Sequence, residues 1–281
     1  MTSPHAHPEP LPARARRAGR TWLFAAVALA VLAVAGVVGV RMWMPVPAAP
    51  VAAAADAAPA VIAPVSLAIP EDPTVLIFGD SWTYGSAASL PTLGYAYVIG
   101  DRLGWNAIVD GVRGSGYLKP GLDGGSYGER IAALDPALDP DLIIVEGSIN
   151  DRRLPADGYR AAVTAAWDQL AALYPNAAIV ILGPAPQILP VEEATARIDA
   201  DLSSLAAERG WWYISPIAEG WIDADNYAQV IDTGIGRDHP STVGHQYLAT
   251  RLAESLDAMT DGADGTQVAA DAPAESDLTG P

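Results

Sequence analysis

Apolar runs typical of buried strands alternate with longer helical segments through the middle of this chain. The strand-like runs lie at residues 74–79, 106–110, 141–146, 177–183 and 211–215. The helical segments lie at 91–103, 126–134, 157–174, 190–209 and 241–258. Continuous apolar strands separated by helices favour a parallel sheet that is covered by helices on both sides. The sequence therefore predicts an α/β domain with five parallel strands over residues 71–258.

The beginning of the chain predicts a membrane segment. Residues 22–40 contain no charged side chain and lie between Arg20 and Arg41. A helix of that length spans about 28 Å, which is close to the thickness of a bilayer's hydrocarbon core. Four arginines in the basic leader, residues 1–21, predict a cytoplasmic amino terminus. We therefore expect residues 22–44 to be a transmembrane signal-anchor, and a cleaved signal peptide is the alternative.

Two further segments flank the predicted domain. Residues 45–70 are rich in Ala and Pro, which is typical of an extended linker. Residues 259–281 carry five acidic side chains and no basic one, which predicts a disordered tail. With an uncleaved anchor, the protein is expected to be a single-pass protein of the cell membrane with its folded domain on the extracytoplasmic side. Cleavage of the segment would instead give a secreted protein.

The composition excludes several kinds of site and partner. The chain has no cysteine, so disulfides, thiolate metal sites and a cysteine nucleophile are excluded. Only His239 and His245 lie within the predicted domain, and we expect neither a metal nor a cofactor. The net charge of -17 repels phosphate backbones, so nucleic acid is not an expected partner.

Four segments with catalytic residue types are expected to meet at one edge of the sheet. Ser81, in Gly79-Asp80-Ser81, follows the first strand. Gly114 and Asn150 follow the second and third strands, and His239 precedes the last helix. Ser81 is the expected nucleophile and His239 the base that takes its proton. The backbone N–H groups of Ser81 and Gly114 and the side-chain amide of Asn150 are the expected oxyanion donors.

The same four residues, in this order and in these loops, resemble the SGNH (GDSL-type) hydrolase family. The resemblance covers residues 71–258 and implies a flavodoxin-like three-layer α/β/α sandwich. It also implies ester hydrolysis through an acyl-enzyme, without a metal or cofactor. One departure is small, because Ser148 stands where the family's Gly-x-Asn-Asp motif has its glycine.

A second departure concerns the acid that orients the histidine. The family usually has an aspartate three residues before it, and this chain has Gly236 there. Three arrangements remain open: Asp238 as the third member, Asp232 folding back, or a Ser-His dyad held by a backbone carbonyl. Neighbouring side chains in an extended loop normally point apart. We therefore place the carbonyl first and Asp238 next.

Four other residues are of types that often occur in functional sites. Trp82 and Trp221 are candidates to line an acyl or sugar pocket in substrate binding. Ser126 fits the G-x-S-x-G pattern, but no strand precedes it as a nucleophile elbow requires. We expect His245, inside the last helical segment, to be structural.

These observations together predict a serine esterase tethered to the membrane. Its expected substrate is a small-molecule or polysaccharide ester, such as a carbohydrate carrying O-acetyl groups. One alternative is an acyltransferase, in which a sugar hydroxyl instead of water resolves the Ser81 acyl-enzyme. Another is a non-catalytic cell-surface binding module on the same scaffold.

Overall fold

The computed structural model describes residues 66–260. The predicted leader, anchor and acidic tail, and most of the linker, lie outside the described residues. Between residues 66 and 260, no helix is both long enough and apolar enough to cross a membrane.

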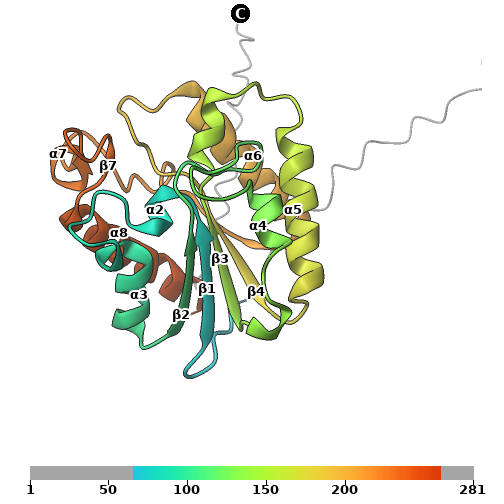
Figure 1. The fold of residues 1–281 in the computed structure, drawn as a ribbon. Coiled ribbons are helices and arrows are strands. Elements are labelled where there is room, and N and C mark those ends of the chain that lie inside the picture. The colour runs from blue at the N-terminus through green and yellow to red at the C-terminus, as the bar shows by residue number, and fades with distance from the viewer. Residues whose placement is uncertain (1–65, 261–281) are drawn as a thin grey trace, which may run out of the picture. The chain divides into compact units, whose positions relative to one another are not determined.

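Five parallel strands form the central sheet (Figure 1). They are β1 (Thr74–Gly79), β2 (Asn106–Gly111), β3 (Leu142–Glu146), β4 (Ala178–Leu182) and β5 (Trp212–Ile214). Their order is β2-β1-β3-β4-β5, which is the flavodoxin-like order. The prediction of a parallel five-stranded α/β domain is confirmed, and each strand lies within two residues of its predicted bounds.

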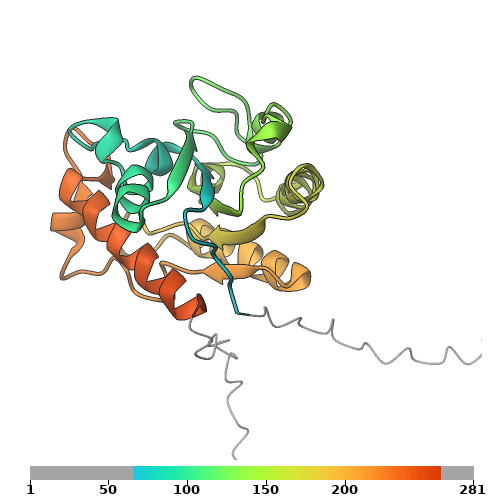
Figure 2. The same ribbon diagram turned by 90° about the horizontal axis from the view of Figure 1, so that it is seen from below.

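Helices cover both faces of the sheet (Figures 1 and 2). One face carries α3 (Tyr95–Leu103) and α8 (Thr242–Thr260). The other carries α4 (Tyr127–Ile131), α5 (Tyr159–Leu173) and α6 (Glu193–Arg209). The predicted helix at 91–103 is divided, because Gly94 separates the 3-10 turn η1 (Pro91–Leu93) from α3.

Short elements complete the domain at the edges of the sheet. They are α2 (Ser81–Tyr84), α7 (Tyr227–Val230), the 3-10 turns η2 (Pro136–Leu138) and η3 (Ile149–Arg153), and the antiparallel pair β6 (Ile231–Asp232) and β7 (His239–Pro240).

Alternate residues of each strand enter two separate cores. Val75 and Ile77 of β1 pack with residues of α3 and α8. Leu76 and Phe78 pack on the opposite face, against α4, α5 and α6. Because side chains alternate between the two faces of a strand, a strand buried on both sides reads as one continuous apolar run.

The strand order creates one preferred place for a site. β1 pairs with β2 on one side and with β3 on the other. In open α/β sheets, such a reversal of strand order leaves a crevice beyond the carboxyl ends of the strands. The helix α2 begins immediately after β1 at this edge, and η3 follows β3 closely (Figure 1).

Candidate active site

Ser81 begins the one-turn helix α2, directly after β1. Its Oγ lies 2.9 Å from Nε2 of His239, which comes from the short strand β7. Asp80 caps the turn, because its Oδ1 accepts the backbone N–H of Trp82 at 2.9 Å. Gly79 is required here, since a Cβ would lie 2.2 Å from Oγ1 of Thr83. Two residues 158 positions apart in the chain thus form a hydrogen-bonded serine–histidine pair.

Two backbone carbonyls hold the other ring nitrogen of His239. Nδ1 lies 2.8 Å from the carbonyl oxygen of Gly236 and 3.1 Å from that of Arg237. A carbonyl oxygen only accepts, so Nδ1 carries the hydrogen in this arrangement. Nε2 is then the unprotonated nitrogen and accepts from Ser81, as a general base must.

Among the described residues, neither candidate aspartate is hydrogen-bonded to the ring, and this corrects the assignment of Asp238 as third member. Within residues 66–260, the Asp238 carboxylate makes no hydrogen bond to His239, and its backbone turns at a positive φ of 62°. The Asp232 carboxylate instead accepts the N–H of Gly234 at 2.9 Å. The carbonyl of Gly236 therefore occupies the place that an acid takes in a triad.

The predicted oxyanion donors lie on three segments that follow β1, β2 and β3 at the same edge of the sheet. Gly114 has a φ of 76°, a left-handed conformation that favours glycine. In the described part of the chain, the N–H groups of Ser81 and Gly114 have no protein acceptor. Asn150 differs, because its amide donates to Oδ2 of Asp80 at 2.9 Å and to the Ser115 carbonyl at 3.0 Å. An oxyanion that takes a hydrogen from Asn150 must replace one of these two acceptors.

Asp151 shapes the Gly114 loop, a role that the sequence did not reveal. Its buried carboxylate accepts the backbone N–H groups of Tyr117, Leu118 and Lys119 at 2.7, 3.2 and 3.0 Å. Burial raises the pKa of Asp151 to about 6. The adjacency of Asp151 to Asn150 was the available sequence signal, because a rigid turn places both side chains near the same loop.

A second buried acid, Glu146, supports the turn that carries Ser81. Its Oε2 accepts the Asp80 N–H at 3.1 Å and the Thr83 hydroxyl at 2.9 Å. Burial, together with the nearby Asp80 charge, raises the pKa of Glu146 well above its ordinary value. Burial also raises the pKa of Asp80, and the hydrogen bond from the Trp82 N–H, the charge of His239 when it is protonated, and the charge of Arg130 oppose that rise. Both acids of this buried pair thus have a raised pKa.

Arg130 connects the ends of β1 and β2 beneath the site. Its Nη1 donates to the Gly79 carbonyl at 2.8 Å and to the Ser115 hydroxyl at 2.7 Å. Its Nη2 forms an ion pair with Asp110 at 2.8 Å. The guanidinium also lies 4.1 Å from the centre of the Phe78 ring. These contacts fix the nucleophile turn relative to the Gly114 loop.

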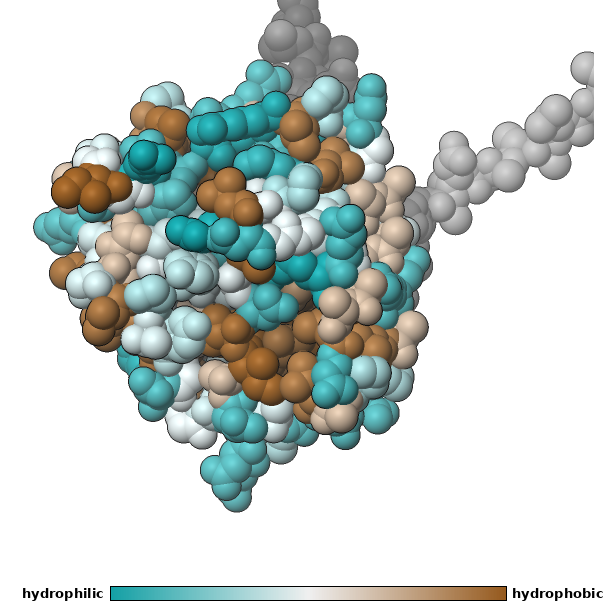
Figure 3. Space-filling view, viewed as in Figure 1, coloured by the Kyte–Doolittle hydropathy of each residue, from teal (hydrophilic) through white to brown (hydrophobic). Residues whose placement is uncertain are grey.

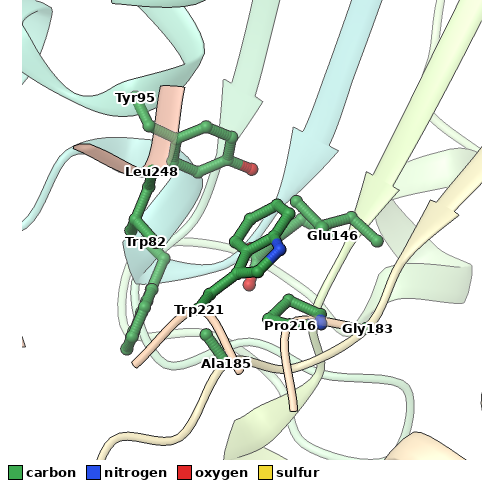
Figure 4. A pocket seen from close by; sticks show the side chains of 9 residues that line it. Trp82, Tyr95, Glu146, Gly183, Ala185, Pro216, Trp221 and Leu248 are labelled. Atoms are coloured by element: carbon green, nitrogen blue, oxygen red, sulfur yellow. The ribbon is translucent and has the colours of Figure 1, made fainter. Parts of the chain in front are cut away.

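The two tryptophans expected to bind substrate lie in the core instead. Trp82 and Trp221 are 3% and 1% exposed and pack with α8 and the sheet. Both line a cavity of about 20 Å³ together with Tyr95 and Glu146 (Figure 4). Indole rings are the largest apolar groups available, and here they fill the space between α2, α8 and the sheet.

The open cleft lies on the other side of His239. It has a volume of about 450 Å³, and Tyr84, Arg113, Ile235 and Arg237 are among its lining residues. Figure 3 shows that the surface over the loops that follow the strands is mostly hydrophilic, with separate apolar spots. A polar molecule therefore suits this cleft better than a long hydrocarbon chain.

Two other residues have the structural roles expected of them. His245 is fully buried, and its ring accepts the Tyr95 N–H at 3.1 Å and donates to the Ser86 carbonyl at 3.0 Å. Ser126 caps α4 in a capping box with Glu129, away from any nucleophile elbow. Across residues 66–260, no group of three or more acidic or histidine side chains is arranged to hold a metal ion.

A family model and a related protein both assign this chain to the same family. The model of the GDSL-like Lipase/Acylhydrolase family matches residues 77–247. A GDSL lipase from Mycobacterium tuberculosis is 27% identical over 190 residues, which cover 64% of this chain and 79% of the relative.

Two solved structures share the fold at low sequence identity. An aryl esterase from M. smegmatis has a TM-score of 0.51 and 17% identity over 66% of this chain and 99% of its own. A carbohydrate acetylesterase from Sinorhizobium meliloti has a TM-score of 0.52 and 18% identity, with the same coverage of 66% and 99%.

Proposed function

The chain belongs to the GDSL-like lipase/acylhydrolase family of serine ester hydrolases, and from that premise we propose that it removes short acyl groups from carbohydrate hydroxyls. The observation that carries the proposal is the 2.9 Å contact between Ser81 Oγ and His239 Nε2. In this reaction the oxygen of Ser81 attacks the acyl carbon while Nε2 takes the hydroxyl proton. The alcohol leaves with that proton, and water then repeats the sequence to release the acid.

Charge develops on the acyl oxygen during each attack. The N–H groups of Ser81 and Gly114 supply two donors for it, since neither is used by a protein acceptor between residues 66 and 260. Asn150 supplies the third when the oxyanion replaces its present acceptor, the Ser115 carbonyl. Each such donor is worth about 3 kcal/mol of transition-state stabilisation.

The space around the pair supports a short acyl group on a polar alcohol. Trp82 and Trp221 fill the region beside α2 and leave a cavity of only about 20 Å³. The cleft of about 450 Å³ at His239 is open and carries charged side chains, which suits a sugar. A structural neighbour is described as a carbohydrate acetylesterase, and this agrees with acetyl as the acyl group.

The location of the enzyme is part of the proposal. The apolar segment 22–44 with its flanking arginines supports a membrane anchor that displays the hydrolase domain outside the cytoplasm. Recovery of the intact amino terminus in the membrane fraction is the expected result. A mature protein that begins within residues 45–70 and lies in the culture medium would identify a cleaved signal peptide.

A series of p-nitrophenyl esters tests the chemistry. The full chain should hydrolyse the acetate faster than the octanoate, and Ser81→Ala should lower kcat by about 10⁴-fold or more. A fluorophosphonate probe should label the wild type and leave Ser81→Ala unlabelled. Absence of both hydrolysis and labelling in folded protein would favour the non-catalytic binding module instead.

A further inference from the structure

In the part of the chain that the structure describes, basic side chains without an ion-pair partner gather on the segments that carry the proposed site residues. Residues 66–260 contain four basic side chains that form no ion pair there: Arg102, Lys119, Arg153 and Arg237. Three of these four lie on loops or turns that carry proposed site residues, and only Arg102, at the end of α3, lies elsewhere. In a chain with a net charge of -17, unpaired cations are expected to find acidic neighbours easily. Their concentration at this edge of the sheet points to a partner that is not part of the domain.

Two basic side chains border the open cleft directly: one is the unpaired Arg237, and the other, Arg113, is already ion-paired. Arg113 and Arg237 line it together with His239. Arg113 lies over the ring of Tyr84, with its guanidinium carbon 5.2 Å from the ring centre, and pairs with the exposed Asp123. Arg237 belongs to the loop whose carbonyls hold His239.

A third cation lies beside the oxyanion loop. Lys119 is the only lysine of the chain, and its Nζ lies 3.7 Å from the position that a Cβ on Gly114 would take. The cleft contains one acidic lining residue, Asp232, whose Oδ1 already accepts the Gly234 N–H. When Asp123, the partner of Arg113, is counted, three cations stand against two carboxylates here, and the excess positive charge comes from the unpaired Arg237 and Lys119.

We propose that this site prefers esters whose alcohol portion carries a carboxylate, such as an O-acylated acidic sugar. The proposal rests on the proposed esterase function and names its substrate class. A carboxylate in the cleft faces Arg113 and Arg237 while the acyl carbon lies at Ser81. A cleft lined by charges of one sign concentrates ligands of the opposite sign and orients them. The guanidinium fork also matches a carboxylate geometrically.

The test compares two acetyl esters of the same shape, 4-acetoxybenzoate and its neutral amide, 4-acetoxybenzamide. The measured quantity is the ratio of their kcat/KM values, divided by the ratio of their rates of alkaline hydrolysis. This ratio should favour the carboxylate by about tenfold in the full chain at low salt. Raising NaCl from 0.02 to 0.5 M should reduce it several-fold, because mobile ions screen exposed charges.

Matched variants assign the preference to named residues. Arg113→Gln and Arg237→Gln should each lower the ratio about three- to tenfold, and the double variant should bring it close to one. Arg113→Lys should retain most of it, because the charge remains. Arg102→Gln makes the same change of net charge at the far end of α3 and should leave the ratio unchanged.

Two results would overturn the proposal. One is a wild-type ratio near one, and the other is a ratio in the double variant equal to that of the wild type, with folding verified by thermal melting. Both results leave ester hydrolysis intact and so leave the proposed function standing. If neither ester is hydrolysed, or Ser81→Ala hydrolyses both as well as the wild type, the esterase function fails and the substrate class fails with it.

Discussion

Because backbone carbonyls hold Nδ1 of His239, we expect Asp238 to be dispensable for catalysis. The substitution Asp238→Asn removes the charge and keeps the shape. The backbone at this position has a φ of 62°, a conformation that asparagine adopts readily, so the substitution should not disturb the loop. Both atoms that hold Nδ1, the carbonyl oxygens of Gly236 and Arg237, belong to the main chain and are unaffected.

The expected magnitude follows from what the substitution leaves in place. In a triad that relies on its acid, the same change lowers kcat by about 10⁴-fold, or about 5.5 kcal/mol. Here Asp238 makes no hydrogen bond to the ring in the described structure, and only a solvent-screened charge is lost. We therefore expect kcat to fall by less than about threefold, or roughly 0.6 kcal/mol.

A companion variant disturbs the carbonyl itself. Gly236→Ala adds a Cβ that would lie 2.7 Å from the Cβ atoms of both Ala87 and Asp232, so the loop must shift. A misplacement of about 1 Å costs roughly 100-fold in rate, and we expect kcat to fall by about that factor. Steady-state hydrolysis of p-nitrophenyl acetate measures both variants, with Asp232→Asn as a charge-matched control that should resemble the wild type. A 10³-fold loss in folded Asp238→Asn would refute the reasoning and show that this carboxylate reaches Nδ1 during turnover.

Two buried titratable groups give further predictions. Glu146→Gln keeps a side-chain oxygen that can accept from the Asp80 N–H and should keep kcat within about threefold. Glu146→Ala leaves the Asp80 N–H unpaired and should cost about 1–3 kcal/mol in urea unfolding, while the Thr83 hydroxyl retains the Tyr95 hydroxyl as its partner at 2.8 Å. Equal destabilisation by both substitutions would contradict the role of this side-chain oxygen as the acceptor for the Asp80 N–H. Burial lowers the pKa of His245 to about 4, below the unfolded value of about 6.5, so the folded state binds fewer protons and loses stability as the pH falls through this range. At pH 4.5 the loss in the free energy of unfolding amounts to about 2.5 kcal/mol. His245→Asn should remove that part of the pH dependence in unfolding titrations. An unchanged pH dependence would show that a group other than His245 is responsible.

The fold was predictable from the sequence because the pattern of apolar residues determines where the strands and helices lie. Each of the five apolar runs became a strand, and burial of the sheet on both faces explains why those runs lack polar interruptions. Boundaries were predicted less well where a short turn competes with a helix. Pro91 and Gly94 divided one predicted helix, and the segment at 126–134 shortened to Tyr127–Ile131.

The serine and histidine of the candidate site were also predictable, because their residue types and their positions after strands narrow the choice. The supporting contacts were not. Asp151, Glu146 and Arg130 act through backbone groups of other loops, and such pairings depend on the three-dimensional approach of distant segments. The core placement of Trp82 and Trp221 was not predictable for a related reason. An indole suits a hydrophobic core as well as a sugar pocket, and only its burial in the structure distinguishes the two.

The backbone carbonyl of Gly236 binds Nδ1 of His239, where the family usually has the side chain of an aspartate at the same sequence position. A triad acid performs two tasks at Nδ1: it orients the ring and it stabilises the imidazolium that forms when the serine proton arrives. A carbonyl performs the first task fully and the second only as a dipole. The buried Asp80 carboxylate lies 3.5 Å from the Ser81 hydroxyl, and a positive charge on His239 opposes the rise that burial gives the pKa of Asp80. We therefore expect orientation and charge compensation, which one residue combines in a triad, to be divided here between a loop carbonyl and the buried acid next to the nucleophile.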